Sequence, residues 1–470
     1  MKDPVLDYAL GHKPAFLEDL KTLVACPSVG ADPAMAEGME AARVQIEARI
    51  DRMGFRNRQR LNSQKKGGQP AIYAERLDAP GKPTILIYAH YDVQPPDPLD
   101  KWDTSPFELT ERDGKLFGRG VSDDKAPMMI ALDTLAAFVA VEGKLPVNVK
   151  LLIEGEEETG SPSLPDILEN HTELLTADAV LSADGARWRP DLVALNVGSR
   201  GNAGFEIRLQ TAAQDLHSGR YGGIVPNALH EMARLIAKLH DDRGHIAAPG
   251  FYDGVSEPTE AERAEIAAIP YDENGAFQAI GATPQGEAGY STLERLWLRP
   301  TLDVNGMWGG YTGAGSKTVI PHEAFAKLTM RLVPGQDPQR VQHAVLDHLR
   351  NHAPEGAKLD VFGERGASGA YAVPPDHPLL RAASNALEAT TGTKPLKVRI
   401  GASLPLTEMV KRILGLDTVM FSFAIADENF HAPNEFFRLN SIAEGLAAWV
   451  QILREIAETD PAAFTPYRRG

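Results

Sequence analysis

Three consecutive glutamates, Glu156, Glu157 and Glu158, closely follow an apolar run, VNVKLLI, that is typical of a buried strand. Adjacent carboxylates repel one another unless they share a metal ion or a proton. A solvated loop also accommodates such a run, and this is the commoner interpretation of an isolated acidic stretch. The residues that follow the other predicted strands help to decide between a cation site and a loop.

Acidic or histidine side chains also stand at the ends of four other strands or strand-like runs. They are His90 with Asp92, Asp123 with Asp124, Asp184, and His431. Each also fits a simpler role, since an aspartate can cap a helix or a turn and a histidine can lie in a surface loop. Residues i and i+2 of an extended chain share a face, so Asp92 can hold the imidazole of His90.

Five such positions in one sheet topology together predict a site for two divalent metal ions. Histidine nitrogens and carboxylate oxygens are ligands for zinc and manganese, and cobalt also suits them. Two-metal sites hold their ions about 3.5–4 Å apart, bridged by a carboxylate and a water. One glutamate of the triplet could bind a metal while a second acts as a base. Metal-bound water has a pKa of about 7 and could serve as a nucleophile at neutral pH.

Apolar strands separated by helices must position these residues. The predicted strands are 82–90, 147–155, 177–185 and 417–425, and a helix is expected over 127–141. This order favours an α/β fold with a mainly parallel sheet covered on both faces. In open α/β sheets, ligands bind at the carboxyl ends of the strands. Near the end of the chain, Ser441 and Glu444 predict a capping box for the last helix.

The middle of the chain predicts a second α/β unit. A strand that alternates apolar and polar residues is expected at 203–211, an amphipathic helix at 225–242, and another strand at 323–335. The stretch 243–313 is rich in proline and glycine and allows no assignment. A chain of 470 residues is too long for one core. We therefore expect a catalytic domain split into 1–199 and 376–470, with a lid or dimerisation domain inserted at 200–375.

The composition excludes several classes of protein. The net charge of −16 argues against nucleic acid and anionic membranes as partners, because both require a basic face. No apolar run approaches the ~20 residues of a membrane span, and the acidic, interrupted N-terminus is unlike a signal peptide. The single cysteine, Cys26, rules out an internal disulfide. We expect a cytoplasmic protein.

Several stretches, in order along most of the chain, resemble the M20 family of metallopeptidases, in particular its dipeptidase branch with the carnosinase-like cytosolic dipeptidases. They are AHYDVQPPDPLDKWDTSPF, GRGVSDDKAP, EGEEETGS, DLHSGRYGG, GSKTVIP, RLVPG and HAPNE. The sequence departs from the family at Ala89, where glycine is frequent, and Glu156 occupies a variable place. Neither residue corresponds to a metal ligand.

The resemblance implies a role for each candidate residue of the metal site. His90, Asp123 and Asp184 would hold one ion, and Asp123, Glu158 and His431 the other, so that Asp123 bridges the two. Two further residues would assist them, since Asp92 would orient His90 and Glu157 would be the general base. The resemblance also implies a cis peptide bond between Asp123 and Asp124.

The family also implies roles for residues of the inserted domain and of the last part of the chain. His217 would stabilise the oxyanion, and in dimeric members this histidine reaches into the partner's site. Arg331, Asn227 and Ser403 would contact the substrate, including its free carboxylate, which an arginine fork suits. Arg331 also fits a surface charge at a strand end.

Because the histidine that corresponds to His217 serves the partner's site in dimeric family members, we expect a homodimer joined through the inserted domain.

The resulting hypothesis is a di-metal enzyme that hydrolyses the amide bond of dipeptides or short peptides with a free C-terminal carboxylate. An N-acyl-amino-acid deacylase or desuccinylase of the same family is the alternative, with the same site and a different pocket. A catalytically inactive scaffold is a third possibility, which the complete set of ligands and catalytic acids argues against.

Overall fold

The computed structural model describes residues 3–65, 68–401 and 405–468, which form two compact units. Unit 1 comprises Met1–Val197, Val373–Val398 and Met409–Gly470. Unit 2 comprises Gly198–Ala372 and Arg399–Glu408. Ser403, one of the predicted substrate contacts, lies outside the described residues.

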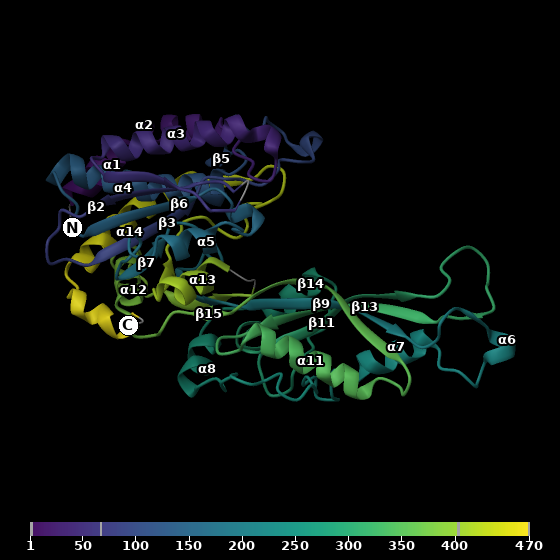
Figure 1. The fold of residues 1–470 in the computed structure, drawn as a ribbon. Coiled ribbons are helices and arrows are strands. Elements are labelled where there is room, and N and C mark those ends of the chain that lie inside the picture. The colour runs from purple at the N-terminus through teal and green to yellow at the C-terminus, as the bar shows by residue number, and fades with distance from the viewer. Residues whose placement is uncertain (1–2, 66–67, 402–404, 469–470) are drawn as a thin grey trace. The chain divides into compact units, whose positions relative to one another are not determined.

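Unit 1 contains a six-stranded sheet with the order β1-β2-β6-β3-β7-β17. Its strands are β1 (Arg56–Leu61), β2 (Ala71–Arg76), β3 (Thr84–His90), β6 (Asn148–Glu154), β7 (Ala179–Ser182) and β17 (Thr418–Met420). The four strands β6, β3, β7 and β17 are parallel, whereas β1 and β2 pair antiparallel at one edge. Every residue of β3 except the first is buried, because helices cover the sheet. Figure 1 shows β6, β3 and β7 side by side.

Helices of seven to nineteen residues pack around this sheet. They are α1 (Pro4–Gly11), α2 (Lys13–Val24), α3 (Ala36–Arg52), α4 (Ala126–Glu142), α5 (Leu164–Asn170), α12 (Pro378–Thr391) and α14 (Leu439–Ala457). The predicted helix over 127–141 is confirmed as α4, which ends at Gly143 in a left-handed conformation suited to glycine. Helix α4 packs against α1 and α14, and α14 packs against α12. Helix α13 runs over Pro405–Leu414.

The predicted capping box at Ser441 and Glu444 is wrong. Helix α14 begins at Leu439, directly after β18 (Phe436–Arg438), and no described side chain caps it. Ser441 is instead buried inside the first turn, and Arg187 donates to its hydroxyl and to the carboxylate of Glu444. The helix starts earlier than the pattern predicts because it continues straight from a strand.

Unit 2 is built on a four-stranded antiparallel sheet with the order β11-β13-β9-β14. Its strands are β11 (Thr301–Gly309), β13 (Glu323–Leu332), β9 (Gly201–Gln210) and β14 (Lys358–Ser368). Helices α7 (Ala228–Ala237) and α11 (Pro338–His352) pack on one face of this sheet and share its apolar core. The predicted strands at 203–211 and 323–335 are confirmed, and the predicted helix over 225–242 is shorter than expected.

The segment over 243–313, which allowed no assignment, contains three short helices and then β11. The helices are α8 (Glu260–Ala267), α9 (Glu273–Ala279) and α10 (Thr292–Leu298). The remaining elements are β4 (Thr110–Arg112), β5 (Lys115–Phe117), β8 (Ala194–Ser199), β10 (Leu216–His217), β12 (Val319–Ile320), β15 (Tyr371–Ala372), β16 (Leu396–Ile400) and α6 (Ser218–Tyr221). The chain is thus a mixed α/β protein.

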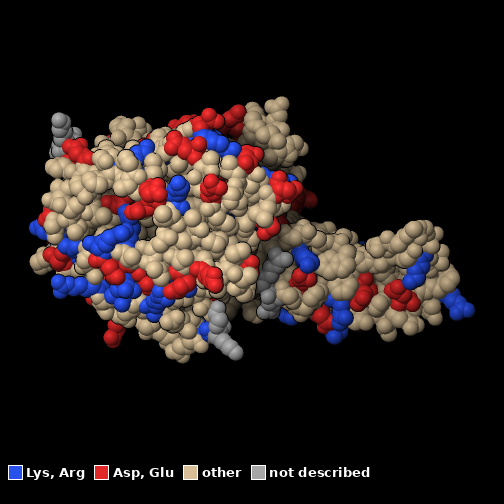
Figure 2. All heavy atoms as spheres, turned by 90° about the horizontal axis from the view of Figure 1, so that it is seen from above, with Lys and Arg blue, Asp and Glu red and all other residues tan. Residues whose placement is uncertain are grey.

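The surface carries charges of both signs. Figure 2 shows acidic and basic side chains intermixed over the face of unit 1 that it displays. Among the described residues, no helix combines the length and the apolar character that crossing a membrane requires.

Candidate metal centre

Three of the predicted metal ligands, His90, Glu158 and Asp184, lie at or just after the ends of strands that the sheet of unit 1 brings to one edge. His90 is the last residue of β3, and in the parallel pairing with β6 it lies opposite Glu154, the last residue of that strand. Tyr88 pairs with Ser182 at the end of β7, so Asp184 follows at the same edge. Neighbouring parallel strands therefore deliver their ligand-bearing loops to one place.

Asp123 lies in a single turn, Val121–Lys125, that precedes α4. The helix-capping interpretation of the two aspartates is wrong, because Lys125 occupies the N-cap and no described side chain caps this helix. The peptide bond between Asp123 and Asp124 is cis, as the family resemblance implies. Before this turn, Gly120 has a left-handed φ of +75°, and an added Cβ would lie 2.1 Å from Cγ1 of Val93. Only glycine fits there.

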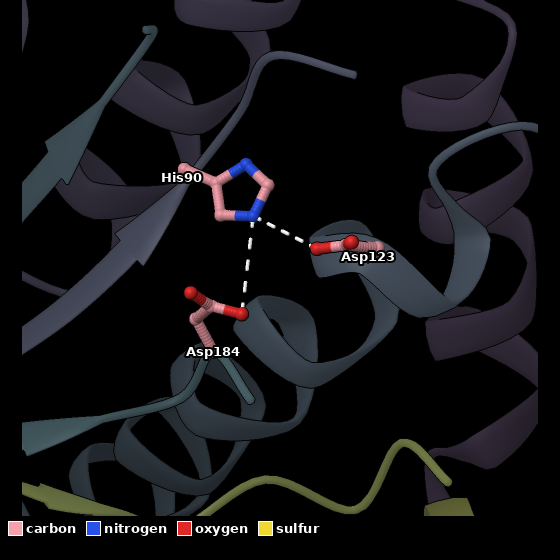
Figure 3. A group of neighbouring side chains, drawn as sticks. All are labelled: His90, Asp123 and Asp184. Atoms are coloured by element: carbon pink, nitrogen blue, oxygen red, sulfur yellow. Dashed lines mark hydrogen bonds and ion pairs between the residues drawn. The ribbon is translucent and has the colours of Figure 1, made fainter. Parts of the chain in front are cut away.

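His90, Asp123 and Asp184 form the first ligand group. The Nε2 atom of His90 lies 3.0 Å from Oδ1 of Asp123 and 4.0 Å from Oδ1 of Asp184. The three side chains come from separate segments of the chain and point toward one another (Figure 3). One ligand atom from each lies within 4.8 Å of the others, and His90 is fully buried. This spacing fits a single ion bound between them.

Asp123, Glu158 and His431 form the second ligand group. The Nε2 atom of His431 lies 3.2 Å from Oδ2 of Asp123 and 3.1 Å from Oε2 of Glu158. One ligand atom from each again lies within 4.8 Å of the others. Asp123 therefore directs one carboxylate oxygen to His90 and the other to His431, which is the geometry of a bridging carboxylate.

Asp92 connects His90 to the glutamate triplet. The Nδ1 atom of His90 lies 3.1 Å from the carbonyl oxygen of Asp92 and 3.4 Å from its Oδ1. A proton on Nδ1 would donate to Asp92 and leave the Nε2 lone pair directed at the first ligand group. The carboxylate of Asp92 also accepts the backbone N–H groups of Glu157 at 3.2 Å and Glu158 at 3.1 Å. It thus orients the imidazole and the glutamate turn together.

The three glutamates have three different environments. Glu156 turns away from the ligand groups, and its carboxylate accepts the backbone N–H groups of Gln69 and Ser163. Glu158 belongs to the second ligand group. Burial, reinforced by nearby carboxylates, raises the pKa of Glu157 well above its usual range, although His90 opposes this effect. Of the three, Glu158 lies in a group of side chains that could hold a metal ion.

Burial and mutual hydrogen bonds shift the pKa values of the ligand side chains. Burial acts to raise the pKa of Asp123, but hydrogen bonds from His431 and His90 lower it below its usual range. Hydrogen bonds to Asp123 and Glu158 raise the pKa of His431 to about 10. Burial raises the pKa of Asp184 to about 6. A divalent cation can take the place of these shared protons, and the set of imidazole and carboxylate donors fits zinc, manganese or cobalt.

Known proteins match this chain along almost all of its length. The profile of peptidase family M20/M25/M40 matches residues 86–455. The chain belongs to this family. The human Beta-Ala-His dipeptidase is 31% identical, over 97% of this chain and 93% of its own length. The Cys-Gly metallodipeptidase of Schizosaccharomyces pombe is 30% identical, over 96% of this chain and 97% of its own length.

Solved structures agree with these relatives. The crystal structure of human carnosine dipeptidase 1 matches with a TM-score of 0.74 and 30% identity, over 97% of this chain and 98% of that one. An M20 family metallo-carboxypeptidase from Sulfolobus solfataricus matches with a TM-score of 0.78 and 31% identity, over 94% of this chain and 99% of that one. This M20 family member is thus a peptidase, a hydrolase of amide bonds.

In this M20 peptidase, the predicted site residues of unit 2 lie on separate elements. His217 is exposed at the end of β10, where its Nδ1 accepts the backbone N–H of Gly219 at 3.0 Å. Asn227 is the N-cap of α7 and accepts the backbone N–H groups of Leu229 and His230. The structure therefore gives Asn227 a helix-capping role.

Arg331 is half-buried on β13 and lines a cavity of about 1100 Å³ within unit 2. Arg200 lines the same cavity and donates to the carbonyl oxygen of Gly401 at 2.8 Å. Burial, together with the nearby charge of Arg331, lowers the pKa of Arg200 to about 10. The lining of this cavity also includes three further arginines and four acidic residues, so its charge is mixed.

Sequence reasoning missed one polar neighbour of the second ligand group. Gln94 donates through Nε2 to Oε2 and to the carbonyl oxygen of Glu158, each at 3.0 Å. Its position, four residues after His90, carries no signal by itself, because only the fold brings it to Glu158.

Proposed function

We propose that this peptidase hydrolyses dipeptides, or other short peptides with a free C-terminal carboxylate, with two divalent metal ions as cofactors. The observation that carries the proposal is the pair of ligand groups that share Asp123. The relatives support it, since they are named for the substrates Beta-Ala-His and Cys-Gly. The deacylase alternative is not favoured, because these relatives are dipeptidases.

The two ligand groups would hold one ion each, with zinc, manganese and cobalt as suitable metals. When bound, such ions supply the Lewis acidity that makes a water molecule nucleophilic near neutral pH and polarises the scissile carbonyl. The protein's part is to fix the ligands. Asp92 holds His90 in one orientation, and Gln94 holds Glu158.

Glu157 is the residue that we assign to proton transfer. It belongs to neither ligand group, yet its carboxylate interacts electrostatically with His90, Asp123 and Asp184. It would accept a proton from the attacking water and then donate it to the nitrogen of the departing amine, which makes the amine a better leaving group.

Unit 2 would complete the site. We assign oxyanion stabilisation to His217 and recognition of the substrate carboxylate to Arg331, with Asn227 and Ser403 as further substrate contacts. The assignments of His217 and Arg331 rest on the matching stretches DLHSGRYGG and RLVPG, and Arg331 also lines a large cavity. Those of Asn227 and Ser403 rest on the family resemblance alone. We further propose that the segment 200–375 acts as a lid, that the protein is a homodimer joined through it, and that it works in the cytoplasm.

The test combines metal replacement with a substrate panel. Protein treated with a chelator should lose activity, and zinc, manganese or cobalt should restore it, with the metal content measured by elemental analysis. The panel should contain Beta-Ala-His, Cys-Gly, a tripeptide and N-acetyl amino acids. We expect the dipeptides to have the highest kcat/KM. Full activity of metal-free protein, or a preference for the N-acetyl amino acids, would contradict the proposal.

A further inference from the structure

Two fully buried charges of unit 1 have no role in the chemistry described so far. Arg119 and Glu435 are each 1% exposed, and Nη1 of Arg119 lies 2.7 Å from Oε2 of Glu435. They come from the two stretches GRGVSDDKAP and HAPNE, which also carry Asp123 and His431. A buried ion pair contributes little net stability, because removing both charges from water costs about as much as their attraction returns. The role of the Arg119–Glu435 pair must therefore be sought in its contacts with neighbouring residues.

The carboxylate of Glu435 is bound by the loop that carries Asp123. It accepts backbone N–H groups from Gly120 at 2.8 Å, Ser122 at 2.9 Å and Asp123 at 3.1 Å. Backbone N–H groups of one turn that converge in this way form an anion-binding site, and here the anion is a side chain of the same protein. The N–H of the bridging ligand is itself one of the three donors.

The same pair holds the loop that carries His431. Arg119 donates through Nη2 to the carbonyl oxygen of Ala432 at 3.2 Å. Asn429, His431 and Asn434 all have left-handed φ angles, of 58°, 57° and 59°. A residue with a Cβ keeps this conformation only where its surroundings hold it.

Glu428, before His431, provides a second tie to the Asp123 turn. Its carboxylate accepts the hydroxyl of Ser122 and the backbone N–H of Ile425. Glu428 is fully buried, as Glu435 is. The loop of His431 is therefore anchored to the loop of Asp123 on both sides of the histidine.

We propose that the Arg119–Glu435 pair positions Asp123 and His431 relative to each other and thereby sets the affinity of the second ligand group for its metal ion. The pair is a positioning element, because its contacts are with the backbone of the ligand loops. The proposal rests on the proposed metal cofactors. It predicts that loss of the Glu435 charge weakens metal binding even when the fold is intact.

The experiment compares Glu435→Gln with wild type in a titration of the metal-free protein with Co²⁺, followed by visible absorption and by calorimetry. The substitution keeps the shape of the side chain but places an NH₂ group among N–H donors. His431→Ala should lose one Co²⁺ equivalent, which identifies the ion of the second ligand group. In Glu435→Gln, we expect this equivalent to bind about 10–100-fold more weakly than in wild type, with an altered absorption band. The other equivalent should weaken less, because Asp123 is the one member of its ligand group whose loop Glu435 holds.

Asp417→Asn is the matched control. Asp417 is also buried and pairs with Lys411 at 2.8 Å, but it precedes β17, at the opposite end of the parallel strands from the ligands. This variant should lose thermal stability and bind both Co²⁺ equivalents as wild type does. Equal weakening in both variants would overturn the proposal, and so would unchanged Co²⁺ binding in folded Glu435→Gln.

Arg119→Lys is the second variant, in case Glu435→Gln does not fold. It keeps the charge and the Glu435 contacts to the turn, but it loses the fork that reaches Ala432. We expect a smaller loss of affinity at the same Co²⁺ equivalent, and wild-type binding would overturn the proposal. A wild-type protein that binds no Co²⁺ would instead contradict the proposed function.

Discussion

The two sheets of this peptidase distribute polar residues in opposite ways. In unit 1, β3, β6 and β7 are buried parallel strands, and the charged residues gather in the loops at their carboxyl ends. In unit 2, β13 alternates half-buried and buried residues along its whole length. One outward-facing row there includes the stacked rings of Trp308 and Phe325, 5.2 Å apart.

This difference has a physical cause. A parallel sheet with both faces covered leaves only its ends for polar side chains, so ligands from distant parts of the sequence meet there. An antiparallel sheet with one open face carries polar residues along every strand and concentrates none of them. We therefore expect substitutions in unit 1 to abolish metal binding or catalysis, and substitutions in unit 2 to change how substrate is held.

The largest expected effect, on kcat, should distinguish the roles of two neighbouring glutamates of unit 1. Glu157→Gln should retain both metal ions and lose kcat by about 10²–10⁴-fold, because it removes only the proton transfer. Glu158→Gln should instead lose one metal ion, since Glu158 is a member of the second ligand group. Steady-state kinetics and elemental analysis of both variants are the measurements. A Glu157→Gln variant with near-normal turnover would show that another residue transfers the proton.

The next largest expected effect, on kcat, tests whether His217 of unit 2 serves the site of a partner subunit. His217→Ala should lose about 10²–10³-fold in kcat, the usual cost of an oxyanion donor, with both metal ions retained. If His217 serves the partner's site, mixed dimers of His217→Ala and Glu157→Gln should regain activity, because one of their two sites has both intact residues. Co-expression with two affinity tags isolates such dimers. No recovery in verified mixed dimers, or a monomeric protein, would rule out action in trans.

A smaller effect is expected at Arg331. Arg331→Met should raise KM by about 10–100-fold with little change in kcat, since a hydrogen bond to a charged group is worth about 1.5–3 kcal/mol. The same dipeptide with a C-terminal amide is the control substrate. The variant should lose the preference for the free acid over the amide. A preference that persists would place carboxylate recognition elsewhere.

The smallest effect concerns a buried histidine of unit 1 far from any catalytic role. Burial lowers the pKa of His377 to about 4, and its Nδ1 accepts the N–H of Leu379 as the N-cap of α12. Between about pH 6.5 and pH 4, the His377 imidazole is protonated in the unfolded chain and neutral in the folded chain. The free energy of unfolding should therefore decrease as the pH falls through that range.

His377→Asn keeps a capping acceptor and removes the titration. Between pH 7 and pH 5, wild type should lose up to about 2 kcal/mol more stability than this variant, as measured by urea unfolding at each pH. Parallel pH profiles of the two proteins would contradict the lowered pKa.

Local patterns predicted some elements well and others poorly. The predicted strand at 82–90 became β3 and the predicted helix over 127–141 became α4, because long apolar runs carry a strong signal. The stretch 243–313 failed because its helices have only seven or eight residues. Two capping boxes were nevertheless present in it, Thr259 with Glu262 and Ser291 with Glu294, and they mark the starts of α8 and α10.

The sequence by itself determined the family and the identities of the candidate ligands, because those depend on residue types in a fixed order along the chain. The family resemblance already implied different roles for the three glutamates and a bridging Asp123, and the tertiary structure added the hydrogen bonds that Asp123 makes with His90 and His431. It alone also paired Arg119 with Glu435, more than three hundred positions apart. Such contacts arise from packing between distant loops, and local spacing carries no information about which distant loops will meet.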